Sequence, residues 1–287
     1  MWTALILCRF VHFSMVLVLF GLCLCRDVIF RKSLSQAGFL LQRRTMLWLV
    51  AVALVSAVAW LMLTAASMDG SWHAAVDRRT LLLIMGSTFF GKVWALHLAL
   101  CGLMVLVLAR PLASAPFLRL MISALLLATL APVGHGAMFS GLYGHLLMLN
   151  QIVHLGAVSA WLGALCLLLV LVVRPETVDV RALLLRFSGI GYVLVALIIT
   201  TGLVNVRVLS GAPWPVPAFT GFGLILSVKV GLVLCMLLLA YLNRMMLRHS
   251  DASLSRLRIS ITLECLFGFG AVAAVSLLGT LPPMLAT

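Results

Sequence analysis

The sequence is poor in charged residues, and acidic residues are the scarcest of them. Only 7 of the 287 residues are Asp or Glu, charged residues of both signs make up 9%, and 64% are hydrophobic. A soluble domain of this length exposes far more charge, so the composition excludes one. The scarcity of carboxylates also argues against a transporter for Mg²⁺ or Ca²⁺, because both ions need several oxygen ligands.

Motifs of hydrolases and nucleotide-binding proteins are also missing. The sequence has no phosphate-binding loop, no serine elbow and no His-Glu-x-x-His zinc motif, so we expect no enzyme. The 7 cysteines form no Cys-x-x-Cys pair and are interpreted as small core residues. The net charge of +13 is interpreted as topological anchoring of a membrane protein, which removes the reason to expect a nucleic-acid partner.

Long apolar runs recur along the whole chain, each close to the ~20 residues that cross a bilayer as a helix. The runs are apolar on all sides, which excludes the alternation of a membrane β-barrel. The first run is too long for a signal peptide and lacks its cleavage site, so it is interpreted as a span. The sequence predicts an all-α polytopic membrane protein, with a single transmembrane helical domain over 1–287. The eight spans are predicted near 2–25, 44–67, 89–109, 118–137, 148–173, 187–210, 221–243 and 259–281.

Basic residues gather in alternate loops, whereas the other loops hold only Arg78 and Arg79. Because Lys and Arg are enriched in cytoplasmic loops, both termini are predicted to face outward, which in a bacterium is the periplasm. Residues 80–88 are too few to cross and are predicted to form a short interfacial or re-entrant helix on the outer side. The basic loops contain Arg26, Arg31, Lys32, Arg43, Arg44, Arg110, Arg119, Arg174, Arg181, Arg186, Arg244, Arg248, Arg256 and Arg258.

Six of the 7 histidines fall in the predicted outer half of the protein. An ionisable group inside a membrane indicates a functional site, although a neutral imidazole bonded to a neighbouring helix is the structural alternative. Imidazole binds copper, zinc, nickel and haem iron, and thioether selects Cu(I). The candidate metal ligands are His12 and His97 within spans, His135 at a span end, His145 in an outer loop and His154 early in a span.

Five other residues are candidate supporting groups. Met138 and Met148 flank the outer loop that contains His145, where they could form an entry point for a soft metal. Arg9 shares a helix face with His12, with snorkelling to the outer interface as its alternative. Lys229 lies deep in the seventh span. Glu264 lies in the eighth span, with pairing to a basic loop residue as its alternative.

These motifs, in this order and at these depths, resemble the bacterial copper resistance D proteins (the CopD/PcoD family) over nearly the whole chain. The residues that carry the resemblance are Arg9-x-x-His12 with Gly21, Thr88-Phe-Phe-Gly91-x-x-Trp94, Gly134-His135-Gly136, Asn150 to His154 with Trp161-x-Gly163, Gly202-x-x-Asn205, Lys229, Asn243-Arg244, Glu264 and Pro282-Pro283.

The resemblance implies a multi-pass copper homeostasis protein of the bacterial inner membrane that moves copper from the periplasm. It also implies a small periplasmic copper carrier of the CopC type as a partner. Some relatives have a histidine where this chain has Gln151, and His97 falls where relatives often have another polar residue. From the comparison with the family's motifs, we rank His12, His135 and His154 first as candidate copper ligands, and His97 and His145 second.

Two other interpretations stay open at the level of sequence. Histidines on neighbouring helices at equal depth are typical of b-type haem ligation, which would make the protein an electron carrier or a membrane oxidoreductase. Alternatively, the protein is a membrane subunit that docks a periplasmic partner, with the histidines as packing groups. The sequence is compatible with a homo-oligomer in the bilayer and does not define its size.

Overall fold

The computed structural model describes residues 1–30, 43–109, 116–133, 139–173, 180–248 and 254–281. Over these residues the chain is helical without strands, and eight helical segments are long and apolar enough to cross a membrane. The prediction of an all-α protein with eight spans is therefore confirmed. The helices are α1 (Trp2–Leu24) continued by a π-helix (Cys25–Ile29), α2 (Arg43–Asp69), α3 (Arg78–Ser87), α4 (Phe89–Ala109), α5 (Pro116–Ala128), α6 (Gly141–Val173), α7 (Val180–Ser210), α8 (Gly221–Arg248) and α9 (Leu254–Leu278), with 3₁₀ turns at Trp72–Ala75 and Ala131–Val133.

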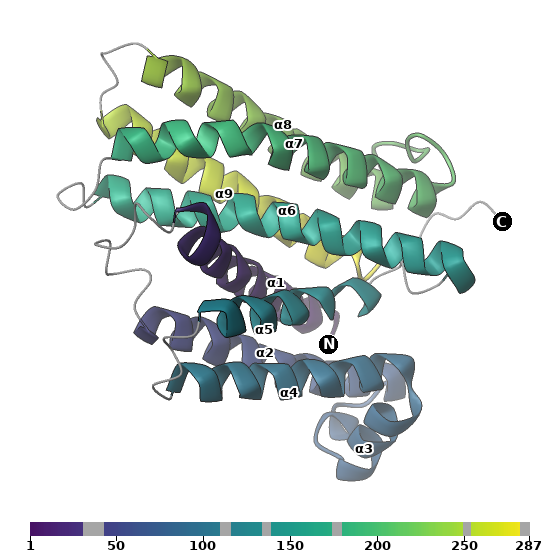
Figure 1. Ribbon diagram of the computed structural model, residues 1–287. Helices are drawn as coiled ribbons and strands as arrows, with labels where there is room; N and C mark the ends of the chain where they lie inside the picture. The colour runs from purple at the N-terminus through teal and green to yellow at the C-terminus, as the bar shows by residue number, and fades with distance from the viewer. Residues whose placement is uncertain (31–42, 110–115, 134–138, 174–179, 249–253, 282–287) are drawn as a thin grey trace.

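Helix α1 lies at the centre of the bundle (Figure 1). It packs against α2 and α5 on one side and against α6 and α9 on the other, and one hydrophobic core joins all of these helices. The start of α1 and the end of α9 lie at the same end of the bundle, as an even number of spans requires (Figure 1). The side of the membrane that this end faces, and the single-domain organisation, stay predictions.

Two glycines allow α1 and α6 to pack with their backbones in contact. A Cβ atom on Gly21 of α1 would lie 2.0 Å from the carbonyl oxygen of Ser159, and one on Gly163 of α6 would lie 2.5 Å from the Cα atom of Gly21. Small residues permit such close approaches between membrane helices, where van der Waals packing replaces the hydrophobic effect as the source of stability. This crossing fixes α1, and with it His12.

The short helix predicted near 80–88 is present as α3, and its depth in the membrane stays a prediction. Asp77 caps it by accepting hydrogen bonds from the backbone N–H groups of Arg79, at 3.4 Å, and Thr80, at 2.9 Å. The backbone and hydroxyl hydrogen bonds of Thr80 hold the pKa of Asp77 below its ordinary value. Such capping is the usual reason for an Asp immediately before a helix.

Several span boundaries differ from the prediction, and α7 begins at Val180, seven residues before the predicted start at 187. Helix α6 begins at Gly141, seven residues before the predicted start at 148, so His145 lies on a helix and the prediction of an outer loop there is wrong. Helix α5 ends at Ala128 and is followed by a 3₁₀ turn over Ala131–Val133, and the predicted end of this span at 137 lies outside the described residues. Hydropathy marks the apolar part of a helix and misses a helical end that contains Gly and His.

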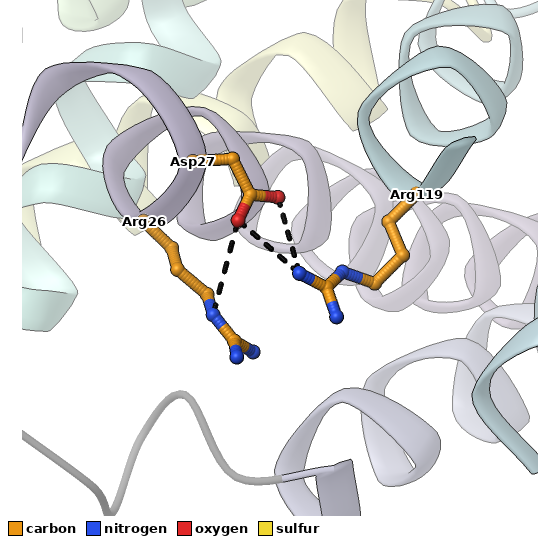
Figure 2. Close-up of polar contacts among 3 residues, drawn as sticks. All are labelled: Arg26, Asp27 and Arg119. Carbon is orange, nitrogen blue, oxygen red and sulfur yellow. Dashed lines mark hydrogen bonds and ion pairs between the residues drawn. The ribbon is translucent and has the colours of Figure 1, made fainter. Parts of the chain in front are cut away.

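Arg119 was interpreted as a loop anchor, but it is a buried residue of α5. Its Nη2 atom lies 3.2 Å from Oδ1 of Asp27, and the two side chains are only 4% and 7% exposed (Figure 2). Arg26 approaches the same carboxylate more loosely, at 3.8 Å, with a side chain 35% exposed. The buried pair therefore ties the π-helical end of α1 to the start of α5.

Candidate functional site

Two of the candidate histidines lie in contact inside the bundle. His12 on α1 and His97 on α4 are both fully buried, and their ring centroids are 4.9 Å apart with an angle of 62° between the ring planes. For each ring, Nε2 is buried and has no hydrogen-bond partner among the described residues. The two imidazoles are thus in ring contact and each has an unpartnered Nε2 atom among the described residues, although a buried polar atom without a partner costs stability.

The partners of Nδ1 determine which nitrogen of each ring carries the proton. Nδ1 of His12 lies 3.1 Å from the carbonyl oxygen of Ala53, which only accepts, so Nδ1 carries the proton and donates. Nδ1 of His97 lies 2.7 Å from Oγ1 of Thr129, whose own proton is donated to the carbonyl oxygen of Leu126 at 2.7 Å. Thr129 must therefore accept from His97. Both Nε2 atoms are left with a free lone pair, the form in which imidazole binds a metal.

Aromatic rings enclose the pair. Trp94 stacks on His97 with centroids 4.8 Å apart and an interplanar angle of 11°, and it is also 5.3 Å from the ring of His12. Trp60 on α2 meets His12 edge-on at 5.6 Å. The indole N–H of Trp94 donates to the carbonyl oxygen of Ala57 at 2.8 Å, which fixes the orientation of its ring. The histidine rings are therefore held in place and shielded from solvent.

Polar atoms of α2 and α1 complete the surroundings of His12. Ser56 lies 3.0 Å from Nδ1 of His12 through its Oγ atom, and its carbonyl oxygen accepts from the thiol of Cys8 at 3.2 Å. Among the described residues, no group of three or more His, Cys, Asp or Glu side chains is arranged to hold a metal ion. The arrangement is thus a two-imidazole site without an anionic ligand.

His154 occupies a different part of the bundle. Its Nδ1 atom is 2.8 Å from Oγ1 of Thr201 on α7, and it lines a cavity of about 250 Å³ together with residues of α1, α7, α8 and α9. Amides beside it join α6 to α7: Asn150 donates to Oδ1 of Asn205 at 2.9 Å, and Asn205 donates to Gln151 at 2.8 Å. The sequence ranking placed His12 with His154, whereas the ring that contacts His12 is that of His97.

The other candidate ligands are more exposed or lie outside the described residues. His135 and Met138 fall within 134–138, so their predicted roles stay untested. His145 is exposed on α6, and Met148 is partly buried three residues further along the same helix. The predicted entry point at these residues stays a prediction.

Arg9 and Glu264 are both buried in the bundle, which differs from the alternatives considered for them, namely snorkelling of Arg9 and pairing of Glu264 with a basic loop residue. Arg9 is only 8% exposed, and its guanidinium lies over the Trp60 ring at 4.8 Å from the centroid, so it does not snorkel to the interface. Glu264 is 3% exposed and accepts a hydrogen bond of 2.5 Å from Asn243 on α8, and among the described residues it forms no ion pair with a basic loop residue. Lys229 lines the same cavity as His154.

Sequence reasoning missed the residues that orient the pair, namely Ser56, Thr129 and Trp60. Ser56 and Trp60 come from α2, and Thr129 comes from the turn after α5, so no spacing within the sequence connects them to His12 or His97. One signal did exist: Trp94 and His97 are three residues apart and therefore share a helix face. That spacing would have justified a higher rank for His97.

The fold and the buried histidine pair define a polytopic membrane protein with a candidate site for a soft or borderline metal. Residues 1–146 match the family model described as copper resistance protein D-like, N-terminal domain, and residues 181–278 match the model described as copper resistance protein D. The chain belongs to the copper resistance protein D family.

Two curated relatives match over nearly their full length. The chain is 30% identical over 299 residues to "Copper resistance protein D" of Pseudomonas syringae pv. tomato, covering 96% of this chain and 95% of that protein. It is 27% identical over 297 residues to "Inner membrane protein YebZ" of Escherichia coli (strain K12), covering 98% of each chain. No solved structure matches.

Proposed function

We propose that the protein binds copper between His12 and His97 and moves it from the periplasm into the inner membrane as part of copper homeostasis. The observation that carries the proposal is the pair of contacting, fully buried imidazoles whose Nε2 atoms have no partner among the described residues. Membership of the copper resistance protein D family supports copper as the metal, and the name of the Escherichia coli relative, "Inner membrane protein YebZ", supports the inner membrane.

Copper fits this pair better than other metals do. Structural zinc sites use four protein ligands and catalytic ones use three, whereas the described residues offer two imidazoles here. Cu(I) accepts a low coordination number, needs no anionic ligand and binds imidazole well. Stacking of Trp94 on His97 keeps water away, which favours the lower oxidation state.

The haem alternative receives no support from the comparisons, and the geometry disfavours it at this pair. Axial imidazoles bind a haem iron from opposite faces, so the macrocycle must lie between the two rings. The rings of His12 and His97 are 4.9 Å apart at their centroids and pack against each other. A porphyrin would have to separate them.

The depth of the pair suits a carrier that takes copper from one side. At 1.5 Å per residue, His12 and His97 lie about 15 and 12 Å from the starts of α1 and α4. Those starts are at the end of the bundle predicted to face the periplasm. A periplasmic copper carrier of the CopC type would deliver its ion at this end, and no chemical step is required of the protein.

Copper binding by single variants tests the proposal. The detergent-purified protein is loaded with Cu(I) and analysed for metal content and for its visible spectrum. We expect one tightly bound copper and no Soret band in the wild type, and at least about tenfold weaker binding in His12→Ala and in His97→Ala. His145→Ala is the matched control, because His145 is exposed on α6. Unchanged binding in both pair variants, or a Soret band with stoichiometric iron, would refute the proposal.

A further inference from the structure

The cavity beside His154 contains two cationic side chains and no acidic one among its described lining residues. Arg9 of α1 and Lys229 of α8 both line it, and the remaining wall is mostly aliphatic. Both residues lie about 10–12 Å from the starts of their helices, which are at the same end of the bundle (Figure 1). Two cations at this depth in a membrane are costly unless an anion accompanies them.

Unused hydrogen-bond donors line the same cavity. Nε of Arg9 and the indole Nε1 of Trp161 are buried and have no partner among the described residues, and the two side chains are 8% and 6% exposed. Both groups can only donate. A ligand that satisfies them must therefore carry an acceptor.

The same features argue against a metal cation here. Lys229 and His154 line the same cavity. A copper ion bound to His154 would face this ammonium without a carboxylate to offset the repulsion. The cavity and the His12–His97 pair thus differ in the sign of the charge that they favour.

We propose that the cavity binds an amphiphile with an anionic head group, placed against Arg9 and Lys229, and with its hydrocarbon chain along the aliphatic wall formed by α6, α7 and α9. The head group is the carboxylate of a fatty acid or the phosphate of a phospholipid, which present the same chemistry to these donors. The volume of about 250 Å³ accommodates a head group and part of a chain. This inference does not depend on copper binding.

Ligand retention and thermal shift test the inference on the full-length protein in a neutral detergent. Bound fatty acids and phospholipids are extracted and quantified from the wild type, Lys229→Gln, Lys229→Arg and Lys92→Gln. Lys92 is the control, because it is an exposed lysine of α4 that does not line the cavity. We expect the wild type, Lys229→Arg and Lys92→Gln to retain an anionic amphiphile, and Lys229→Gln to lose about nine-tenths of it.

Added probes separate the sources of the anion. Palmitate, phosphatidylglycerol, inorganic phosphate and the uncharged monoolein are titrated into delipidated protein, and the unfolding temperature is measured. A shift with palmitate alone identifies a carboxylate, and a shift with phosphatidylglycerol alone identifies a phospholipid; both support the inference. An equal shift with inorganic phosphate, an equal shift with monoolein, or no shift with any probe overturns it. If Lys229→Gln does not fold, Arg9→Gln replaces it in the same comparison.

Discussion

The close contact between α1 and α6 makes a specific mutational prediction. Replacing Gly21 by Ala adds a Cβ atom 2.0 Å from the carbonyl oxygen of Ser159, where ordinary contact begins near 3.4 Å. The obstacle is backbone and cannot rotate away, so α1 and α6 must separate by more than an ångström. Overpacking of this kind costs about 1–3 kcal/mol, and we expect the upper end here because a whole helix has to move.

The displacement should also reach the metal site, because α1 carries His12 on its opposite side. Metal–ligand distances tolerate changes of only about 0.2 Å, so a shift of this size should weaken Cu(I) binding by about tenfold or more. The predicted result for Gly21→Ala is thus a lower unfolding temperature together with lower copper affinity.

Thermal unfolding in detergent and competitive Cu(I) titration measure the two effects. Gly156→Ala is the matched control: Gly156 lies on α6, and a Cβ atom there meets nothing within 4 Å. Alanine is the better helix former, so the control should be neutral or slightly stabilised. If Gly21→Ala behaves like Gly156→Ala in both assays, the close crossing of α1 and α6 is incorrect.

Three further predictions concern single contacts. Thr129→Ala removes the hydroxyl that accepts from Nδ1 of His97 and should lower copper affinity about tenfold in the same titration. Thr129→Ser retains the hydroxyl and should retain the affinity. Equal affinities of the two variants would show that this hydrogen bond does not orient His97. His154→Ala should leave the copper stoichiometry unchanged, and loss of the metal would place copper in the other cavity. Asp27→Asn leaves the buried Arg119 without its carboxylate and should lower the free energy of unfolding in urea by about 3–5 kcal/mol. Arg26→Gln, at the more exposed partner, should change that free energy little. Similar decreases for the two variants would contradict the burial of the Asp27–Arg119 pair.

The membrane architecture was predictable from the sequence because apolar length is a local property. Each span needs ~20 apolar residues, and eight such runs are visible without knowledge of their neighbours. The errors in the predicted span boundaries occur where the ends of the helices are less apolar. The first turns of α6, from Gly141 to Met148, contain glycine and histidine, so hydropathy placed the helix start too late.

The site was only partly predictable, because its assembly depends on tertiary contacts. His12 and His97 were both identified as costly residues within spans, yet nothing in the sequence shows that α1 and α4 bring them together. The family pattern lowered the rank of His97, whereas the structure gives it the closest contact with His12. The hydroxyl of Thr129 and the ring of Trp60 come from other segments of the chain, and only the fold connects them with the histidines.

X-ray absorption spectroscopy of the protein loaded with one equivalent of Cu(I) tests the copper site most directly. The two-imidazole site predicts a first shell of nitrogen scatterers at about 2 Å, with the outer-shell signature of imidazole and no sulfur. The same spectrum should be lost in His97→Ala and kept in His145→Ala. A first shell dominated by sulfur, or a wild-type spectrum in His97→Ala, would contradict copper binding between His12 and His97.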